Sequence, residues 1–229
     1  MRVVRIKLPV SNAYLVVGQR AVLVDAGAPG QADRILDAVR RADVDPSDIS
    51  LLIHTHGHID HAGSTAELRR RVGMPVAVHA ADAPLLRSGS NGTVRPRNVE
   101  ARLVAAVMVR PYEPVEPDLV LTEEISLAGH GVDARVVFTP GHTPGSLSVA
   151  LPTRDVIVGD LVMGGVLGGA LFPRRPRLHY FVDDLAAVHA SVGRVLADAP
   201  ETVLVGHGGP LRAGDVAARL GAGYSGPRL

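Results

Sequence analysis

The sequence of 229 residues contains no cysteine and no tryptophan, and Lys7 is its only lysine. Without cysteine the chain forms no disulfide, carries no thiolate nucleophile and offers no sulfur ligand to zinc or to an iron–sulfur cluster. Aromatic residues make up only 3% of the chain, which argues against a platform that stacks single-stranded nucleic acid. These absences exclude several common chemistries before any motif is considered.

The sequence also has no marked excess of positive or negative charge and no hydrophobic run long enough to cross a membrane. The 24 basic and 23 acidic residues leave a formal net charge of +1, which gives no general attraction for nucleic acid or an anionic membrane. The longest stretch without Asp, Glu, Lys, Arg or His, residues 161–173, is too short to span a bilayer, and Lys7 and Pro9 interrupt the apolar N-terminus. We therefore expect a cytoplasmic protein that binds a small molecule, with no nucleic-acid or membrane partner. The oligomeric state stays open.

The hydrophobic residues, 46% of the chain, are arranged as two rounds of strands followed by helices. Runs rich in Val, Ile and Leu predict strands at residues 3–8, 13–17, 21–24, 49–53, 76–78, 134–138, 147–151, 156–158 and 202–205. Helical spacing of apolar residues predicts helices at 32–41, 64–72, 99–109, 181–196 and 213–220. This order predicts one α/β domain over residues 1–229, built as a four-layer αββα sandwich.

Four metal-binding side chains lie within six residues, directly after the predicted strand at 49–53. They are His56, His58, Asp60 and His61. His56 and His58 are two positions apart, so both imidazoles point to the same side of an extended segment. Asp60 and His61 follow a turn of the chain and reach a second position nearby. Borderline cations such as zinc favour imidazole and carboxylate ligands, so the segment indicates a metal site rather than a solvated loop.

Three further candidate ligands follow later strands. They are His142, Asp160 and His207, and each lies directly next to a glycine. Glycine allows the backbone to turn sharply and to approach an ion closely. Each of the three alone is more often an ordinary loop residue than a ligand. Their position after the first motif, in this order, favours a composite metal site.

This series of residues resembles a known family. Asp25, the motif His56-x-His58-x-Asp60-His61, His142, Asp160 and His207 together are similar to the pattern of the metallo-β-lactamase-fold hydrolases. The resemblance covers nearly the whole chain and implies an αββα sandwich with metals in a cleft at one edge. Many true β-lactamases of this fold have Cys or Ser where Asp160 stands, so the chain looks more like the glyoxalase II, lactonase and thioesterase branch.

The resemblance implies a division of labour between two divalent cations, expected to be zinc, with iron or manganese as alternatives. The first cation would be bound by His56, His58 and His142, and the second by Asp60, His61 and His207, with Asp160 bridging them. Asp60 and Asp160 would also take part in catalysis. Asp25 would accept the second N–H of a ligand imidazole, unless it is only a turn residue that caps Gly27.

The function that the resemblance implies is hydrolysis. Two cations ~3.5–4 Å apart would hold a bridging hydroxide, which forms at neutral pH and attacks a carbonyl carbon. We expect the substrate bond to be an ester, a thioester or a lactone of a small metabolite. The alternatives are an iron-dependent oxidoreductase similar to persulfide dioxygenases, and a metal-dependent phosphodiesterase or nuclease.

Two insertions, residues 86–117 and 164–180, are candidates for the substrate pocket. The second begins with glycines and carries Arg174 and Arg175, followed by His179 and Tyr180. We predict that it is a lid over the metals, and that its two arginines meet an anionic group of the substrate. The alternative is a solvated basic loop. His179 and Tyr180 are predicted to contact substrate and are the candidate proton donors.

Overall fold

The computed structural model describes residues 1–108 and 110–221. Within them, one sheet follows chain order: β1 (Arg2–Lys7), β2 (Asn12–Val17), β3 (Ala21–Val24), β4 (Ile49–Ile53), β5 (Val76–His79) and β6 (Leu119–Leu121). Strands β1 to β3 are antiparallel neighbours, whereas β3 to β6 are parallel. Parallel neighbours need crossover connections, and helices supply several of these here.

A second sheet comes from the other half of the chain, in the order β14-β13-β10-β9-β8-β7. Its strands are β7 (Ile125–Ser126), β8 (Arg135–Phe138), β9 (Leu147–Ala150), β10 (Asp155–Ile157), β13 (Thr202–Leu204) and β14 (Leu211–Arg212). Only the β10–β13 pair is parallel among these neighbours. Short 3-10 turns at Pro46–Asp48 and Ala128–His130 precede β4 and β8.

Side chains that alternate along the strands fill separate apolar layers. In β3, Val22 and Val24 join a core made by residues of both sheets, whereas Leu23 joins the core under the N-terminal helices. In β10, Ile157 faces the shared core and Val156 the core under the C-terminal helices. Successive residues of a strand point to opposite faces, so an unbroken apolar strand serves two cores at once.

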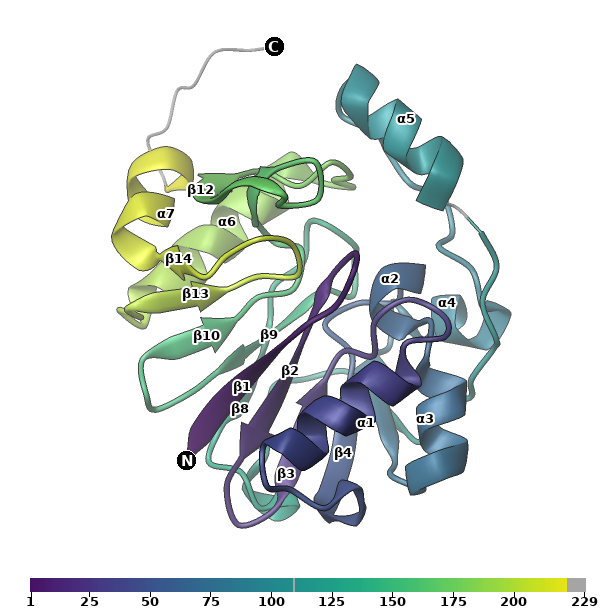
Figure 1. Ribbon diagram of the computed structural model, residues 1–229. Helices are drawn as coiled ribbons and strands as arrows, with labels where there is room; N and C mark the ends of the chain where they lie inside the picture. The colour runs from purple at the N-terminus through teal and green to yellow at the C-terminus, as the bar shows by residue number, and fades with distance from the viewer. Residues whose placement is uncertain (109, 222–229) are drawn as a thin grey trace.

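Helices cover the outer face of each sheet (Figure 1). On the first sheet these are α1 (Ala32–Arg41), α2 (Ile59–Ala62), α3 (Thr65–Val72) and α4 (Ala83–Ser88), and on the second α6 (Leu185–Ala197) and α7 (Ala213–Leu220). Helix α1 buries Ala32, Ile35, Leu36 and Val39, which lie on one helical face. The predicted four-layer αββα sandwich is confirmed.

The structure departs from the predicted elements in two segments near the second sheet. Residues 164–180, predicted as a flexible lid, contain a hairpin of β11 (Met163–Val166) and β12 (Leu171–Arg177). The helix predicted at 181–196 begins at Leu185, because Asp184 caps it by accepting a hydrogen bond from the Ala187 N–H. Within the described residues, no helix combines the length and hydrophobicity needed to cross a membrane.

Helix α5 (Val99–Met108) stands apart from the layers, beyond the edge of the sheets (Figure 1). The predicted helix extended to Val109, which lies outside the described residues. The polypeptide before α5 is tied to the chain after β12, because Arg97 N–H donates to the Tyr180 carbonyl over 3.0 Å and Pro96 forms a bridge with Phe181. The insertion at 86–117 and the hairpin therefore meet at the same edge of the sandwich.

Candidate metal centre

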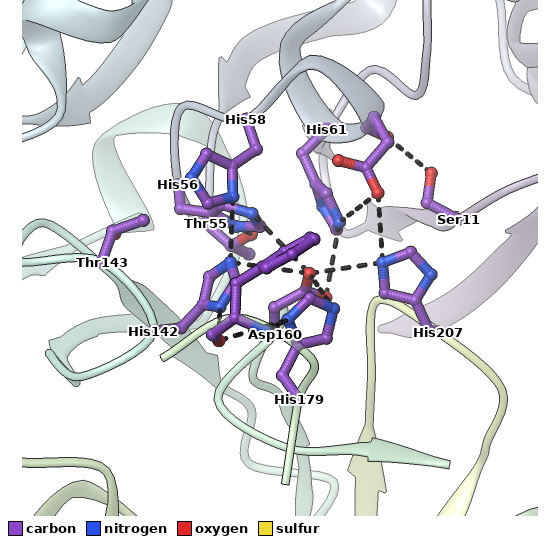
Figure 2. Close-up of polar contacts among 12 residues, drawn as sticks. Ser11, Thr55, His56, His58, His61, His142, Thr143, Asp160, His179 and His207 are labelled. Atoms are coloured by element: carbon purple, nitrogen blue, oxygen red, sulfur yellow. Dashed lines mark hydrogen bonds and ion pairs between the residues drawn. The ribbon is translucent and has the colours of Figure 1, made fainter. Parts of the chain in front are cut away.

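The predicted metal ligands, far apart in the sequence, converge at one edge of the sandwich (Figure 2). Asp25 follows β3, the histidine-rich motif follows β4, and Asp160 and His207 follow the parallel pair β10 and β13. The ends of parallel strands meet at the same edge of a sheet. Backbone hydrogen bonds from Leu147 N to Thr55 O and from Asn12 N to Gly206 O join the two sheets there.

Two groups of donor atoms form at this edge. One is His56, His58 and His142, and the other is Asp60, His61, Asp160 and His207; within each group the candidate ligand atoms lie within 4.8 Å of one another. Asp160 stands between them. Its Oδ2 lies 3.8 Å from His56 Nε2 and 3.3 Å from His207 Nε2. The carboxylate is therefore placed to serve both groups, as the resemblance implied.

Oxygen atoms hold the ring nitrogens that point away from the centre. The Nδ1 of His61 lies 2.8 Å from Asp25 Oδ2, that of His142 lies 2.8 Å from the Phe181 carbonyl, and that of His207 lies 2.9 Å from the Val10 carbonyl. A proton on each Nδ1 leaves the Nε2 lone pair free and aimed inward. His58 is reversed, with Nδ1 inward and 3.0 Å from His142 Nε2.

Asp25 anchors the loop that carries the ligands. It is buried, and its φ of 65° lies in the left-handed region that Asp tolerates better than most residues. Its carboxylate accepts hydrogen bonds from Thr55 N–H over 2.8 Å, from the Thr55 hydroxyl over 2.8 Å and from His61 Nδ1. The turn at Asp25 therefore directs its carboxylate at Thr55 and at the imidazole of His61.

Burial and neighbouring charges shift the pKa values of the candidate ligands in different directions. Burial lowers the pKa of His58 to about 3, and nearby His142 adds to this shift, so the imidazole is neutral. Burial alone would raise the pKa of Asp160, but the neighbouring His179, His207 and His61 hold it well below its usual range. Burial alone would lower the pKa of His207 and His61, but the nearby carboxylates raise it, to about 10 for His207 and well above its usual value for His61. A cation that binds at these two imidazoles therefore displaces their protons.

The remaining polar atoms of the centre provide the test of whether a metal fits. His56 Nε2, His61 Nε2, His207 Nε2 and Asp160 Oδ1 are buried without a hydrogen-bond partner among the residues that the structure describes. Each such atom costs about 1–3 kcal/mol when left unpaired. Divalent cations take lone pairs of this kind, and a set of imidazoles and carboxylates suits borderline metals. The residues present fit divalent metal ions.

Glycine makes the close approach of the strand ends feasible. A Cβ on Gly206 would stand 2.1 Å from Asp160 Oδ1 and 2.6 Å from His61 Cε1. At Gly159, where φ is 52°, a Cβ would stand 2.4 Å from the Thr55 hydroxyl. A larger residue at either position would displace a predicted ligand, or the threonine that holds Asp25.

Sequence reasoning missed Asp82, a fully buried carboxylate that follows β5. Its Oδ2 accepts from Gly57 N–H over 2.9 Å and from the Thr143 hydroxyl over 2.8 Å, and its Oδ1 accepts from Gly145 N–H over 2.9 Å. Asp82 therefore clamps the loop of His56 and His58 to the loop of His142. The available signal was its position just past a parallel strand, at the edge where the ligands gather.

His179 and Tyr180, predicted as substrate contacts, both reach this region. His179 is buried, and its Nε2 lies 3.1 Å from Asp160 Oδ2. With His142 and Asp160 it forms a further group of potential metal-binding atoms. The Tyr180 ring lines the pocket above, while its hydroxyl is turned toward Glu100 at 2.8 Å. His179 is thus closer to the candidate metal centre than the sequence indicated.

Arg174 and Arg175 are not brought to this centre. Both are exposed and line a separate surface hollow with Phe172, Asp215 and Arg219, between β12 and α7. Side chains alternate along a strand, so part of the hairpin faces α7. The turn between β11 and β12, at Leu167 and Gly168, reaches the candidate site instead. The predicted contact of these two arginines with substrate has no geometrical support.

A cavity of about 120 Å³ opens above the centre. Its floor consists of His58, Asp60, Asp160, His179 and His207, and its walls include Val10, Val94, Val104, Leu167 and Phe181. Asn91, Gly168 and Tyr180 complete the lining. A cavity with polar groups gathered at its floor and apolar walls around them is the usual form of a small-molecule site.

Known proteins resemble this chain in sequence. The "Probable metallo-hydrolase YflN" of Bacillus subtilis is 28% identical over 214 residues, which cover 83% of this chain and 76% of that protein. The "Probable metallo-hydrolase MJ0888" of Methanocaldococcus jannaschii is 28% identical over 158 residues, covering 69% and 70%. The "Uncharacterized protein Rv2581c" of Mycobacterium tuberculosis is 34% identical over 212 residues, covering 86% and 85%.

Solved structures share the fold. The BLEG-1 B3 metallo-beta-lactamase superposes with a TM-score of 0.70 at 24% identity, covering 96% of this chain and 98% of that one. The Rm3 metallo-beta-lactamase gives 0.65 at 23% identity, covering 90% and 75%. The family model described as the metallo-beta-lactamase superfamily matches residues 7–207, which include every predicted metal ligand. The chain therefore belongs to the metallo-beta-lactamase superfamily.

Proposed function

We propose that this protein holds two divalent cations and hydrolyses an ester, thioester or lactone bond of a small metabolite. The observation that carries the proposal is the position of Asp160 between two adjoining groups of imidazole and carboxylate donors. A carboxylate has two oxygens that can bind different ions, and its charge offsets theirs. The first cation would be held by His56, His58 and His142, and the second by Asp60, His61 and His207.

The pocket supports hydrolysis by water rather than by a side-chain nucleophile. No serine, threonine or cysteine is among the described residues that line the cavity. Bound divalent cations supply a water-derived nucleophile at neutral pH and polarise a substrate carbonyl. The chain's own contribution is orientation: the Nδ1 contacts and Asp25 fix the imidazoles, and Asp60 reaches from the floor to within 3.1 Å of His207 Nε2.

The donor set supports zinc in preference to manganese. Five imidazoles and two carboxylates make up the two groups, and nitrogen-rich sites suit zinc, whereas manganese favours oxygen ligands. The two-cation site, zinc itself and a small-molecule substrate are all parts of this proposal.

The test uses the full chain, stripped with a chelator and reloaded separately with zinc, manganese or ferrous iron. Metal content and initial rates are measured on a neutral thioester, a γ-lactone, an aryl ester, bis(p-nitrophenyl) phosphate and the β-lactam nitrocefin. We expect two zinc ions per chain, hydrolysis of the carbonyl substrates, and loss of more than about 100-fold in rate after chelation.

Matched outcomes separate the alternatives. Fast cleavage of the phosphodiester alone would reassign the protein to the phosphodiesterases. Iron at one ion per chain, with thiol-dependent oxygen uptake and no hydrolysis, would favour the oxidoreductase. A fully zinc-loaded chain that is inactive on all carbonyl substrates would contradict the proposal.

A further inference from the structure

The walls of the cavity differ in chemistry from its floor. The floor is made of histidine and aspartate, whereas the walls include the apolar residues Val94, Val104, Leu167 and Phe181. No arginine or lysine is among the described residues that line the cavity. A substrate group that extends upward from the metal centre therefore meets hydrocarbon and no cation.

Helix α5 packs as the wall of this cavity and not on the sandwich core. Ala101 is fully buried in a small apolar cluster with Met163, Tyr180 and Phe181, and Val104 packs against the same cluster. On the opposite face, Val99 and Leu103 are 71% and 69% exposed. The buried face of α5 thus covers residues beside the metal centre, which gives the helix a role at the pocket.

Tyr180 joins the two sides of the mouth. Its hydroxyl donates to Glu100 Oε1 on α5 over 2.8 Å and accepts from Gly168 N–H, in the hairpin turn, over 3.2 Å. Arg177 supports the same link, because its Nη2 lies 3.6 Å from Glu100 Oε2. The hydroxyl is committed to holding the walls together, so the wall offers a ligand the apolar ring rather than a polar tip.

The volume of the cavity limits the group that it can hold. The cavity of about 120 Å³ has the volume of roughly four molecules of liquid water. One methylene group is about as large as one water molecule, so the cavity holds about four carbons. A buried carboxylate with no cationic partner would be strongly disfavoured in such walls. The mouth therefore selects a substrate group that is short, uncharged and aliphatic.

We propose that the mouth between α5 and the β11–β12 hairpin is a subsite for an uncharged aliphatic acyl chain of about four carbons beyond the carbonyl. Val94, Val104 and Leu167 form the walls of this subsite, and Tyr180 holds it closed. The assignment of the chain to the acyl side of the scissile bond rests on the proposed hydrolytic function. The subsite itself rests only on the shape and chemistry of the cavity.

The first experiment measures kcat/KM of the zinc-loaded protein on N-acetylcysteamine thioesters from acetyl to octanoyl. We expect a rise of about fourfold with each methylene up to pentanoyl, followed by a plateau. The succinyl thioester, similar in length to pentanoyl but ending in a carboxylate, is expected to be at least about tenfold poorer than pentanoyl.

A matched pair of variants on α5 tests the wall directly. Val104→Asp places a charge inside the cavity and is expected to reduce the preference for pentanoyl over acetyl by at least about tenfold. Val99→Asp makes the same change on the exposed face of the same helix and is expected to leave that preference within about twofold. Equal effects of the two variants would overturn the assignment of Val104.

A binding measurement separates the subsite from the proposed reaction. Acetohydroxamate, pentanohydroxamate and succinyl monohydroxamate carry the same metal-chelating head, and their affinities for the zinc-loaded protein are obtained by calorimetry. We expect pentanohydroxamate to bind at least about tenfold more tightly than either of the others.

The two experiments together separate the subsite from the reaction. Thioester hydrolysis with no dependence on chain length overturns the subsite and leaves the function intact. Chain-length-dependent hydroxamate binding without hydrolysis supports the subsite and overturns the function. If neither the thioester rates nor the hydroxamate affinities depend on chain length, the subsite is overturned.

Discussion

The floor of the pocket, taken here with the ligand loops that Asp25 and Asp82 hold, is built in a different way from the mouth. On the floor, His61 is 0% and Asp160 3% exposed, and both come directly from strands or loops that both sheets hold in place. The mouth consists of a helix outside the layers and a two-stranded hairpin, with a four-residue apolar cluster of its own. Exposed Val99 and Leu103 show how little of α5 is packed.

This contrast separates the reaction from the choice of substrate. Groups that bind metal need fixed positions, and the rigid ends of packed strands provide them. An added helix and hairpin can differ in sequence without disturbing those strands, so the same centre can serve different substrates. We expect changes on the floor to affect metal binding and changes in the mouth to affect substrate preference.

The strongest test of the floor is Asp25→Asn. Asn tolerates the φ of 65°, but it has one carbonyl oxygen where Asp25 accepts hydrogen bonds on both carboxylate oxygens. We expect zinc affinity to fall by about 10–100-fold, measured by competition with a chromophoric chelator. Asp43→Asn is the matched control, because Asp43 is exposed and has a φ of 55°. Similar zinc affinities in both variants would contradict the anchoring role.

A smaller effect on the floor is expected from Asp82→Asn. Three groups donate hydrogen bonds to Asp82: the Gly57 N–H, the Thr143 hydroxyl and the Gly145 N–H. The asparagine amide turns its NH2 group toward at least one of them, so the clamp between the ligand loops loses a hydrogen bond. The free energy of unfolding should fall by about 2 kcal/mol, measured with urea in the presence of a chelator. The control variant, Asp37→Asn, removes only an exposed ion pair with Arg40 and should change the free energy of unfolding by less than about 0.5 kcal/mol. An unchanged stability of Asp82→Asn would show that the clamp is not needed.

The smallest effect is expected in the mouth, from Tyr180→Phe. The variant loses the hydroxyl that links Glu100 to Gly168 but keeps the aromatic wall. Hydrogen exchange of residues 95–108 and 166–169 should accelerate severalfold, whereas the amides of the floor should not change, because one partly buried link contributes about 1 kcal/mol. Glu100→Ala should add little to Tyr180→Phe, since both break the same link. Acceleration that extends to the floor would erase the distinction between the two regions.

Most of the floor was predictable from the sequence. The spacing of His56 and His58 after an apolar strand, and the glycines beside His142, Asp160 and His207, are local signals of loops that present ligands. Asp82 escaped because its partners, Gly57 and Gly145, are distant in the sequence and bind through backbone N–H groups that no motif records.

The mouth was predictable only in part. The segment 164–180 was recognised as an insertion near the site, but its glycines suggested a flexible loop, and its arginines suggested an anionic substrate. Pairing of β11 with β12 orders the segment and turns Arg174 and Arg175 toward α7. Which face of a hairpin meets a cavity depends on what packs against the other face, and local spacing does not carry that information.

The sandwich and the candidate metal ligands could be predicted from the sequence, because alternation along strands and residue type at strand ends are local properties. Packing of the layers places His179 3.1 Å from Asp160, joins two ligand loops through Asp82 and makes the walls above the centre apolar. These features depend on segments that are remote along the chain and adjacent only after packing, so the contacts that define them do not exist until the layers have assembled.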